Sequence, residues 1–240
     1  MKSYVFMLWF LSAAVTLSGL EGFESDSLST QGGILTIHFI GHGTLMFEYG
    51  GKIIHVDPVS READYGKLPK ADLILITHAH FDHLDKQAID KIRRGDTQII
   101  LNQESAAKLG EGTVMANGDV LNVLGLTIQA IPAYNTTKNR ERYHPEARDN
   151  GYMISFNDKR VYVAGDTENH QQMMNLQDID VAFLPMNQPY TMTPEQVAAA
   201  ARAFRPKVLY PYHYGNTDPN RLVDLLQDVP EVEVRIRRLD

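Results

Sequence analysis

The amino-acid sequence predicts an α/β domain in which sheets pack against each other and helices cover them. Three observations support this fold class. From residue 34 the chain begins with short apolar or alternating segments typical of β-strands, its last third alternates helical and strand-like segments, and most strand-like segments are apolar throughout, as buried strands are. No break in composition divides residues 31–240, so we expect a single domain there.

Composition restricts the kinds of chemistry open to this chain. With 240 residues, 43% of them hydrophobic, it can build a sizeable core. A formal net charge of -7 gives no overall attraction for phosphate backbones, so nucleic acid is not expected as a partner. There is no cysteine, which excludes disulfides, thiolate ligands and thiol nucleophiles. Any metal must therefore be held by nitrogen and oxygen atoms.

The N-terminus is typical of a secretory signal peptide. Lys2 precedes the uncharged apolar run "YVFMLWFLSAAVTLSGL", and the small residues Ser18 and Gly19 favour cleavage near its end. We therefore expect residues 1–30 to form a signal peptide and a disordered lead, and the mature protein to be periplasmic or secreted, without stable membrane association. The alternative is an uncleaved helix that anchors the protein, because the run approaches the length that spans a bilayer.

The first half of the domain is expected to begin with a meander of strands. Strands are predicted over residues 34–40, 44–49 and 52–58, and Gly50-Gly51 between the last two is a tight hairpin signal. A buried strand over 71–80 then runs into a polar cluster. The remaining elements expected in this half are a helix over 84–94, a strand over 97–102, a helix over 104–110 and a hairpin over 119–133.

The second half follows a polar stretch, Asn135–Asn150. It is expected to start with a hairpin over 151–167 that turns at Asn157-Asp158. Thr193 should cap an alanine-rich helix, because proline follows it and glutamine stands three residues on. Helices are predicted over 169–176, 193–205 and 218–229, and strands over 181–186, 207–214 and 232–239.

The segment "THAHFDHLD" carries three histidines and an aspartate within six residues, on a loop between a strand and a helix. In an extended loop, His78 and His80 project to the same side, so both imidazoles can bind one ion, while Asp82 and His83 can turn toward a neighbouring point. Histidine and aspartate suit zinc, manganese or iron. The spacing therefore permits two adjacent metal sites. The alternative, exposed histidines without a common role, fits a lone histidine better than a cluster of four groups.

Four motifs in order resemble the metallo-beta-lactamase superfamily. "THAHFDH" is similar to its HxHxDH signature, "HVDP" to its early aspartate motif through Asp57, "VAGDTE" to the later aspartate motif through Asp166, and "YPYHYG" to the final histidine motif through His213. The resemblance covers nearly all of residues 34–240. It implies a four-layer αββα sandwich, with two mixed sheets flanked by helices.

The resemblance also implies a ligand set and a branch. "FIGHGTLMFEYGGKIIHVDPV" in a compact body looks most like the ascorbate-6-phosphate lactonase branch and related metal-dependent hydrolases, in which His42 matches an early histidine near the metals. The implied ligands are His78 and His80 for one divalent metal, Asp82, His83 and His213 for the other, and Asp166 between them.

One position departs from the family pattern. Many members place a histidine ligand where this chain reads "IPAYNTT", and the aligned residue here is Asn135, whose amide oxygen is a weaker, neutral ligand. The first site could be completed by water or by His144 from the same loop. A site with one metal, on Asp82, His83, Asp166 and His213 or on His78, His80 and Asp166, stays an alternative. Tyr134 is a further candidate, whereas His38, His55 and His170 are interpreted as structural.

The leading hypothesis is a metal-dependent hydrolase, with zinc as the expected metal. A bound metal lowers the pKa of its water from about 15.7 to near 7, and the resulting hydroxide could cleave an ester, lactone, amide or phosphoester of a small molecule. Asp82 would orient the water and accept its proton, while His42 or His144 would stabilise the oxyanion and Asp57 would support the ligand loop.

The substrate could be anionic, because the polar loop carries Lys138 and several arginines. Two alternatives are a nuclease, which the acidic charge and expected export argue against, and a non-enzymatic metal-binding or sensor protein on the same fold. The sequence does not indicate an oligomeric state.

Overall fold

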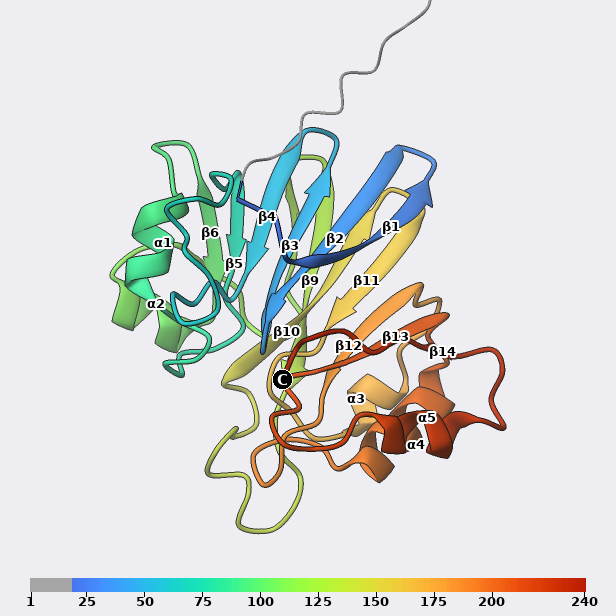
Figure 1. The fold of residues 1–240 in the computed structure, drawn as a ribbon. Helices are drawn as coiled ribbons and strands as arrows, with labels where there is room; N and C mark the ends of the chain where they lie inside the picture. Colours follow the sequence, from blue (N-terminus) through green and yellow to red (C-terminus); the bar gives the residue numbers. More distant parts are fainter. Residues whose placement is uncertain (1–18) are drawn as a thin grey trace, which may run out of the picture.

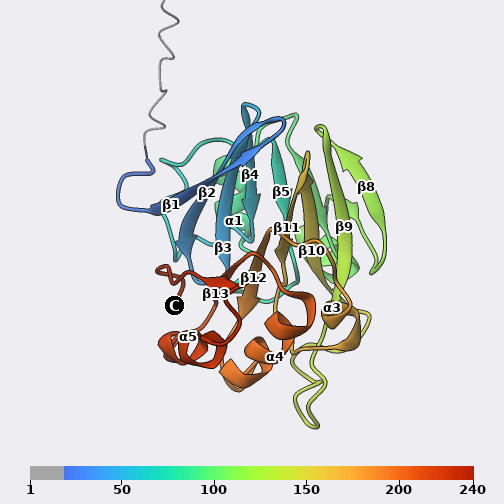
Figure 2. The same ribbon diagram turned by 90° about the vertical axis from the view of Figure 1, so that its right-hand side faces the viewer.

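The computed structural model describes residues 19–240, which form two seven-stranded sheets packed face to face with helices outside them (Figures 1 and 2). In the first sheet the strands lie side by side in chain order, from β1 to β7, and in the second they run from β8 to β14. The strands of the first sheet are β1 Glu24–Thr30, β2 Gly33–Gly41, β3 Thr44–Tyr49, β4 Lys52–Val56, β5 Leu73–Leu75, β6 Gln98–Leu101 and β7 Thr113–Val114. Those of the second are β8 Val120–Val123, β9 Leu126–Ala133, β10 Asp149–Phe156, β11 Lys159–Val163, β12 Val181–Pro185, β13 Val208–Tyr212 and β14 Glu233–Val234.

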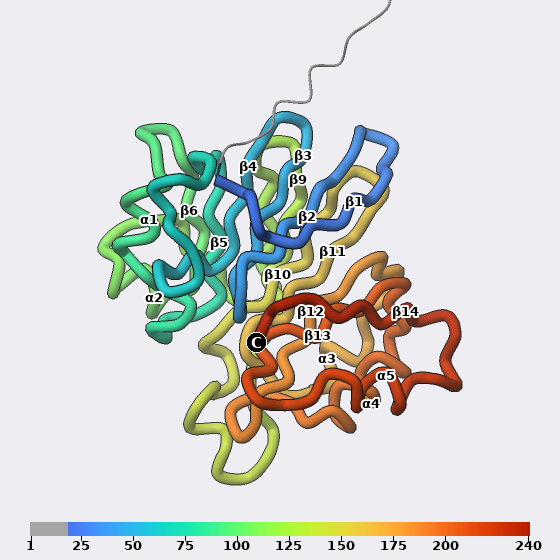
Figure 3. The backbone as a smooth tube through the Cα atoms, viewed as in Figure 1, coloured from blue at the N-terminus to red at the C-terminus, as the bar shows by residue number. Residues whose placement is uncertain are grey.

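Both sheets are mixed, and they share one plan. In each, the first four strands pair antiparallel and the last four pair parallel. The tube view follows this repeated path from blue to red (Figure 3). Tight hairpins join most of the antiparallel strands, as at Gly50 and Gly51, which both adopt positive φ between β3 and β4, whereas a long loop joins β9 to β10.

Helices cover the outer faces of both sheets. The helices are α1 Lys86–Ile92, α2 Gln103–Leu109, α3 Gln171–Met174, α4 Pro194–Phe204 and α5 Asn220–Leu226. Helices α1 and α2 lie beside β5 and β6, and α3, α4 and α5 lie beside β12 and β13 (Figure 1). Thr193 and Gln196 form the predicted capping box at the start of α4. The four-layer αββα fold is therefore confirmed.

The main core lies between the two sheets. It is built by buried apolar side chains from both inner faces, among them Phe47 of β3 and Phe156 of β10, whose ring centroids lie 5.6 Å apart. A second cluster packs α1 against the outer face of the first sheet, where Ile74 meets Ile89 and Ile92. Burial on both faces of β5 explains its unbroken apolar sequence.

The expected disordered lead up to residue 30 is wrong for its last part. Glu24–Thr30 forms β1, which pairs antiparallel with β2 from Glu24 opposite Phe39 to Thr30 opposite Gly33. The sequence "ESDSLST" does not indicate this edge strand, because only alternate side chains are partly buried and most of these are polar. The proposed signal peptide lies mostly in residues 1–18, outside the described residues. Within residues 19–240, no helix is long and apolar enough to span a bilayer.

Candidate metal centre

The candidate site residues gather at one edge of the two sheets because each follows the end of a strand. His42 follows β2, Asp57 follows β4 and the loop with His78 to His83 follows β5. In the second sheet, Asp166 follows β11 and His213 follows β13. Rigid strands thus position side chains that are far apart in sequence.

Three groups of side chains, two of which share His78, could each hold a metal ion, with ligand atoms that lie within 4.8 Å of one another in each group. The groups are His78, His80 and His144; His42, Asp82 and His213; and His78, His83 and Asp166. Every residue of the predicted ligand set belongs to one of these groups. His144, which the sequence offered as one way to complete the first site, stands beside His78 and His80, with ring centroids 5.0 and 4.9 Å away.

Asp166 stands between the groups. Its Oδ2 lies 3.5 Å from Nε2 of His144 and 3.4 Å from Nε2 of His213, and its Oδ1 lies 3.5 Å from Nε2 of His83. A carboxylate has two oxygens that can face different partners. Asp166 is therefore oriented so that it can serve ions on both sides of it.

Two buried carboxylates orient two of these histidines through the ring nitrogen opposite the one that faces Asp166. Nδ1 of His83 donates to Oδ2 of Asp57 at 2.7 Å, and Nδ1 of His144 donates to Oδ2 of Asp149 at 3.2 Å. Each bond places the ring proton on Nδ1 and leaves Nε2 free for a metal. Asp57 also accepts hydrogen bonds from the backbone and hydroxyl of Thr77, so it holds the start of the histidine loop, as predicted.

Burial and charge move the pKa values of the histidines in opposite directions. Burial, together with the neighbouring imidazoles, holds the pKa of His78 well below its ordinary value, which keeps this ligand neutral. Burial also acts to lower the pKa of His83, but the carboxylates of Asp166 and Asp57 outweigh it and raise this pKa to about 9. Without a metal, the His83 cation balances the buried negative charges.

The carboxylates of Asp82 and Asp166 stay ionised. Burial acts to raise the pKa of Asp82, but the imidazoles of His213 and His42, whose Nε2 atoms lie 3.7 and 3.4 Å from its Oδ2, hold it far below the ordinary value. Burial also acts to raise the pKa of Asp166, but the charges of His213, His83 and His144 lower it overall. Both aspartates are thus available as anionic oxygen ligands at neutral pH.

The buried atoms of this cluster fit a divalent cation. Nε2 of His83, Nε2 of His213 and Oδ1 of Asp166 are buried and have no hydrogen-bond partner. Buried polar atoms are nearly always paired, so these need a ligand that the chain does not supply. Imidazole nitrogen and carboxylate oxygen are donors that zinc, manganese and iron accept.

Three non-glycine residues of the centre have left-handed backbones. The φ angles are 50° at His42, 45° at Asp57 and 47° at His213. Few residues other than glycine, asparagine and aspartate adopt this region, and it is found where function fixes a strained geometry. Here it turns the chain sharply at three strand ends. His213 N–H also donates to the carbonyl of His42, which ties two of these turns together.

Asn135 anchors the loop through its nitrogen atoms, whereas its buried Oδ1 has no hydrogen-bond partner. Its amide nitrogen donates to the carbonyls of Arg140 and Tyr190, and its backbone N–H donates to the carbonyl of His144. Tyr134 turns elsewhere, with its ring stacked on His170 and its hydroxyl bonded to Gln172. His144, beside His78 and His80, thus offers the imidazole that Asn135 does not.

The three histidines interpreted as structural have structural partners. His38 lies in β2 beside Glu48, His55 is buried in β4 with Nε2 donating to the carbonyl of Pro69, and His170 caps α3. Sequence reasoning missed Asp149, although its place at the start of a hairpin strand beside the polar loop was a signal.

An open pocket of about 350 Å³ gives access to the centre. It is lined by His80, Phe81, Asp82, Tyr143, His144, Asp166, Asn187, Tyr190 and His213. Tyr143 and Tyr190 meet edge to face, with ring centroids 5.0 Å apart, and form an aromatic wall opposite the aspartates. The pocket size suits a small molecule.

Comparison with known proteins agrees with this geometry. The model of the beta-lactamase superfamily domain matches residues 36–213, so the chain belongs to the metallo-beta-lactamase superfamily. A UPF0173 metal-dependent hydrolase of Thermococcus onnurineus is 31% identical over 218 residues, which cover 83% of this chain and 95% of the relative.

Two solved structures show how far the likeness extends. A crystal structure from Parabacteroides distasonis, assigned as a metal-dependent hydrolase, is 55% identical, with a TM-score of 0.89 over 91% of this chain and all of that one. A metallo hydrolase of Ignicoccus hospitalis shares the fold at 24% identity, with a TM-score of 0.71 over 85% of this chain and 95% of that one.

Proposed function

We propose that the protein hydrolyses an ester, lactone, amide or phosphoester bond of a small molecule, with two divalent metals held at the centre. The observation that carries this proposal is the position of Asp166, whose Oδ2 lies within 3.5 Å of Nε2 of both His144 and His213, while its Oδ1 lies 3.5 Å from Nε2 of His83. The names of the relatives, which are metal-dependent hydrolases, support the reaction class.

The donor set divides into two sites around that aspartate. We assign His78, His80 and His144 to the first metal, Asp82, His83 and His213 to the second, and Asp166 to both. This assignment keeps the pairing that the family resemblance implies and gives the position of Asn135 to His144. Zinc is the proposed metal, because neutral imidazole and carboxylate donors without thiolate are common in its catalytic sites.

The metals would supply a water that ionises near neutral pH and a positive charge for the developing oxyanion. The chain supplies the proton path. Oδ2 of Asp82 is ionised and lies 3.4 Å from Nε2 of His42, so a proton taken up by the carboxylate can pass to the imidazole. Nδ1 of His42 donates to the backbone oxygen of Asp240, which leaves Nε2 to receive that proton and deliver it to the leaving group.

Substrate binding is proposed to involve the aromatic wall. Tyr143 and Tyr190 would pack on the apolar part of a leaving group and exclude water from the cleaved bond. The carboxamide of Asn187 lines the same pocket and can hydrogen-bond a polar group of the substrate. Export to the periplasm or the medium remains part of this proposal and rests on the N-terminal sequence alone.

Elemental analysis of protein purified without added metal is the first test. Two metals per chain are expected in the wild type and fewer in Asp166→Asn, with the exposed Asp64→Asn as the matched control. The metal-loaded protein should then hydrolyse simple nitrophenyl esters, lactones or phosphodiesters, and Asp82→Ala should lower kcat at least 100-fold. Two bound metals without turnover of any of these substrates would contradict the proposal and favour a metal-binding protein.

A further inference from the structure

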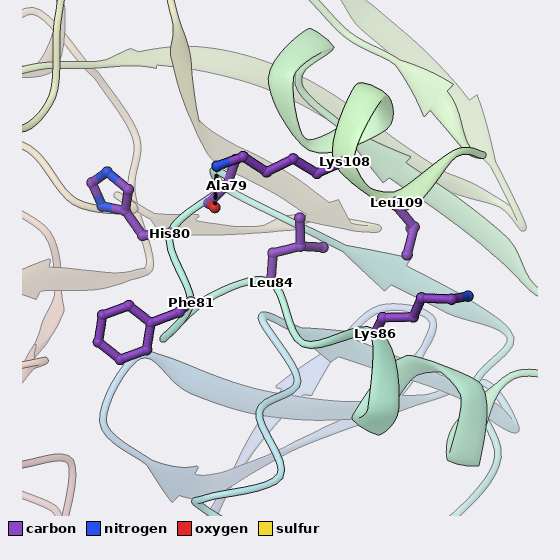
Figure 4. A pocket seen from close by; sticks show the side chains of 7 residues that line it. All are labelled: Ala79, His80, Phe81, Leu84, Lys86, Lys108 and Leu109. Atoms are coloured by element: carbon purple, nitrogen blue, oxygen red, sulfur yellow. Dashed lines mark hydrogen bonds between the residues drawn. The ribbon is translucent and has the colours of Figure 1, made fainter.

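A second, larger pocket of about 490 Å³ adjoins the metal centre (Figure 4). It lies between the loop after β5, the start of α1 and the end of α2, and is lined by Ala79, His80, Phe81, Leu84, Lys86, Lys108 and Leu109. His80 and Phe81 also line the pocket above the metal centre. The two pockets therefore share a wall, and a molecule held over the centre can extend past that wall.

The sides of the second pocket are apolar along most of its length. Leu84 faces it from the loop before α1 and Leu109 from the end of α2, and Ala79 completes that side near His80 (Figure 4). Phe81 is 80% exposed, which is unusual for a phenylalanine next to a functional centre, and its ring stands at the junction of the two pockets. A bound alkyl chain would bury this ring.

The rim is positively charged. The ammonium of Lys108 donates to the carbonyl of Ala79 at 3.0 Å, and that of Lys86 lies at the end far from His80 (Figure 4). Each lysine has one carboxylate partner on its own helix, Glu104 for Lys108 and Asp90 for Lys86. Such exposed pairs are weak, so a carboxylate on a ligand can compete for either ammonium.

We propose that this pocket binds an aliphatic arm of the substrate that ends in a carboxylate. The proposal rests on the hydrolytic function above and names the substrate class: an ester or lactone whose acyl chain carries a terminal negative charge. The carbonyl lies over the metal centre, the methylenes pass Phe81 and lie against Leu84 and Leu109, and the carboxylate meets the ammonium of Lys86 at the end far from His80. The ammonium of Lys108, held at Ala79 nearer the centre, adds positive charge beside the arm.

Two pairs of esters test the arm and its charge separately. The 4-nitrophenyl esters of acetic and hexanoic acid differ in chain length, and we expect kcat/KM to rise roughly two- to fourfold per added methylene that the pocket covers. The 4-nitrophenyl monoester of adipic acid has a six-carbon acyl chain that ends in a carboxylate. We expect its kcat/KM to exceed that of the hexanoate about fivefold, and to do so less at high salt.

The variant Lys86→Met/Lys108→Met removes both charges and keeps the aliphatic stems. It should bring the adipate-to-hexanoate ratio to about one, whereas the control Lys52→Met/Lys67→Met, which removes two exposed lysines that do not line the pocket, should keep the wild-type ratio. Because the readout is a ratio, a general loss of activity does not imitate the result. Phe81→Ala should flatten the dependence on chain length.

Binding separates this proposal from the reaction itself. Calorimetry on metal-loaded protein should show that pimelate binds more tightly than heptanoate, and that the preference disappears in Lys86→Met/Lys108→Met. Such a preference without hydrolysis of any ester would overturn the reaction and support the pocket. A wild-type ratio at or below one, or a ratio that the lysine variant leaves unchanged, would overturn the pocket assignment.

Discussion

Asp149 and His144 form a buried pair in which the imidazole Nδ1 donates to the carboxylate Oδ2 at 3.2 Å, and the opposite ring nitrogen faces Asp166. Asp57 and His83 form the same arrangement in the other half of the molecule. Each sheet thus contributes one carboxylate that fixes the tautomer and direction of a histidine at the centre.

Asp149 is expected to affect metal affinity through its hydrogen bond with His144, although it is not itself a proposed metal ligand. Asp149→Asn is expected to weaken metal binding about 10- to 100-fold, because His144 loses the charge that orients it and raises its basicity. Titration of metal-free protein against a competing chelator measures this affinity. The exposed Asp96→Asn is the control, and equal affinities in both variants would contradict the role given to Asp149.

His144 and Asn135 are expected to affect the protein in different ways. His144→Ala should lower the metal content by about one ion per chain, since it removes a proposed ligand. Asn135→Ala should keep both ions but cost about 1–2 kcal/mol of unfolding free energy, because the partly buried carbonyls of Arg140 and Tyr190 lose their donor. Elemental analysis and urea unfolding measure the two effects.

The opposite pattern would reverse these roles. If Asn135→Ala released a metal while His144→Ala did not, the amide would be the ligand after all. Asn135→His provides a further check: it should add no metal, because two ions are already bound in the wild type on this assignment.

His55 should make stability depend on pH. Its pKa is lowered by burial to about 4, against about 6.5 in the unfolded chain. Between these values the unfolded state binds the extra proton, so stability is fully present above pH 6.5 and is lost as the pH falls toward 4, by about 3 kcal/mol. Urea unfolding of metal-free wild type and His55→Gln from pH 7 to 4.5 should show a shallower loss in the variant. Parallel curves would mean that other groups cause the acid sensitivity.

Asp26 should make β1 essential to the fold. Its carboxylate accepts two hydrogen bonds from Arg237 and one from Tyr210, so it joins the first strand to the C-terminal segment and β13. Asp26→Ala is expected to cost about 2 kcal/mol, because charged hydrogen bonds are lost and the arginine is left without its partner. Burial acts to raise the pKa of Asp26, but these partners lower it overall.

Because the pKa of Asp26 is lowered in the folded protein, the effect of Asp26→Ala should change with pH in a definite direction. A carboxylate with a lowered folded-state pKa contributes stability that is present above its unfolded value, about 3.9, and is lost as the pH falls below it. The cost of Asp26→Ala should therefore shrink between pH 5 and pH 3. Asp64→Ala, which breaks an exposed pair with Lys67 and an exposed hydrogen bond from Gly66 N–H, should cost no more than about 1 kcal/mol at either pH.

The sequence by itself predicted most of the strands, several of the hairpins and the histidine-rich loop of the candidate metal centre. Apolar runs such as the one before His78 read directly as buried strands, and local turn chemistry at Gly50-Gly51 and Thr193 predicted a hairpin and a capping box. Histidines two residues apart face one side where the backbone is extended. Patterns of this kind can be recognised in the sequence because they depend only on local backbone geometry and burial.

Only the tertiary structure decided which residues meet across the sheets. His144 stands beside His78 and His80 because the loop after β9 folds back over the centre, held by Asn135, and no spacing in the sequence encodes that path. Strand β1 was not predicted from the sequence, because an edge strand with a polar outer face is stabilised by its neighbouring strand and by Arg237 and not by an apolar pattern of its own. Contacts between distant segments depend on how the whole chain packs, so their chemistry becomes visible only once the two sheets are together.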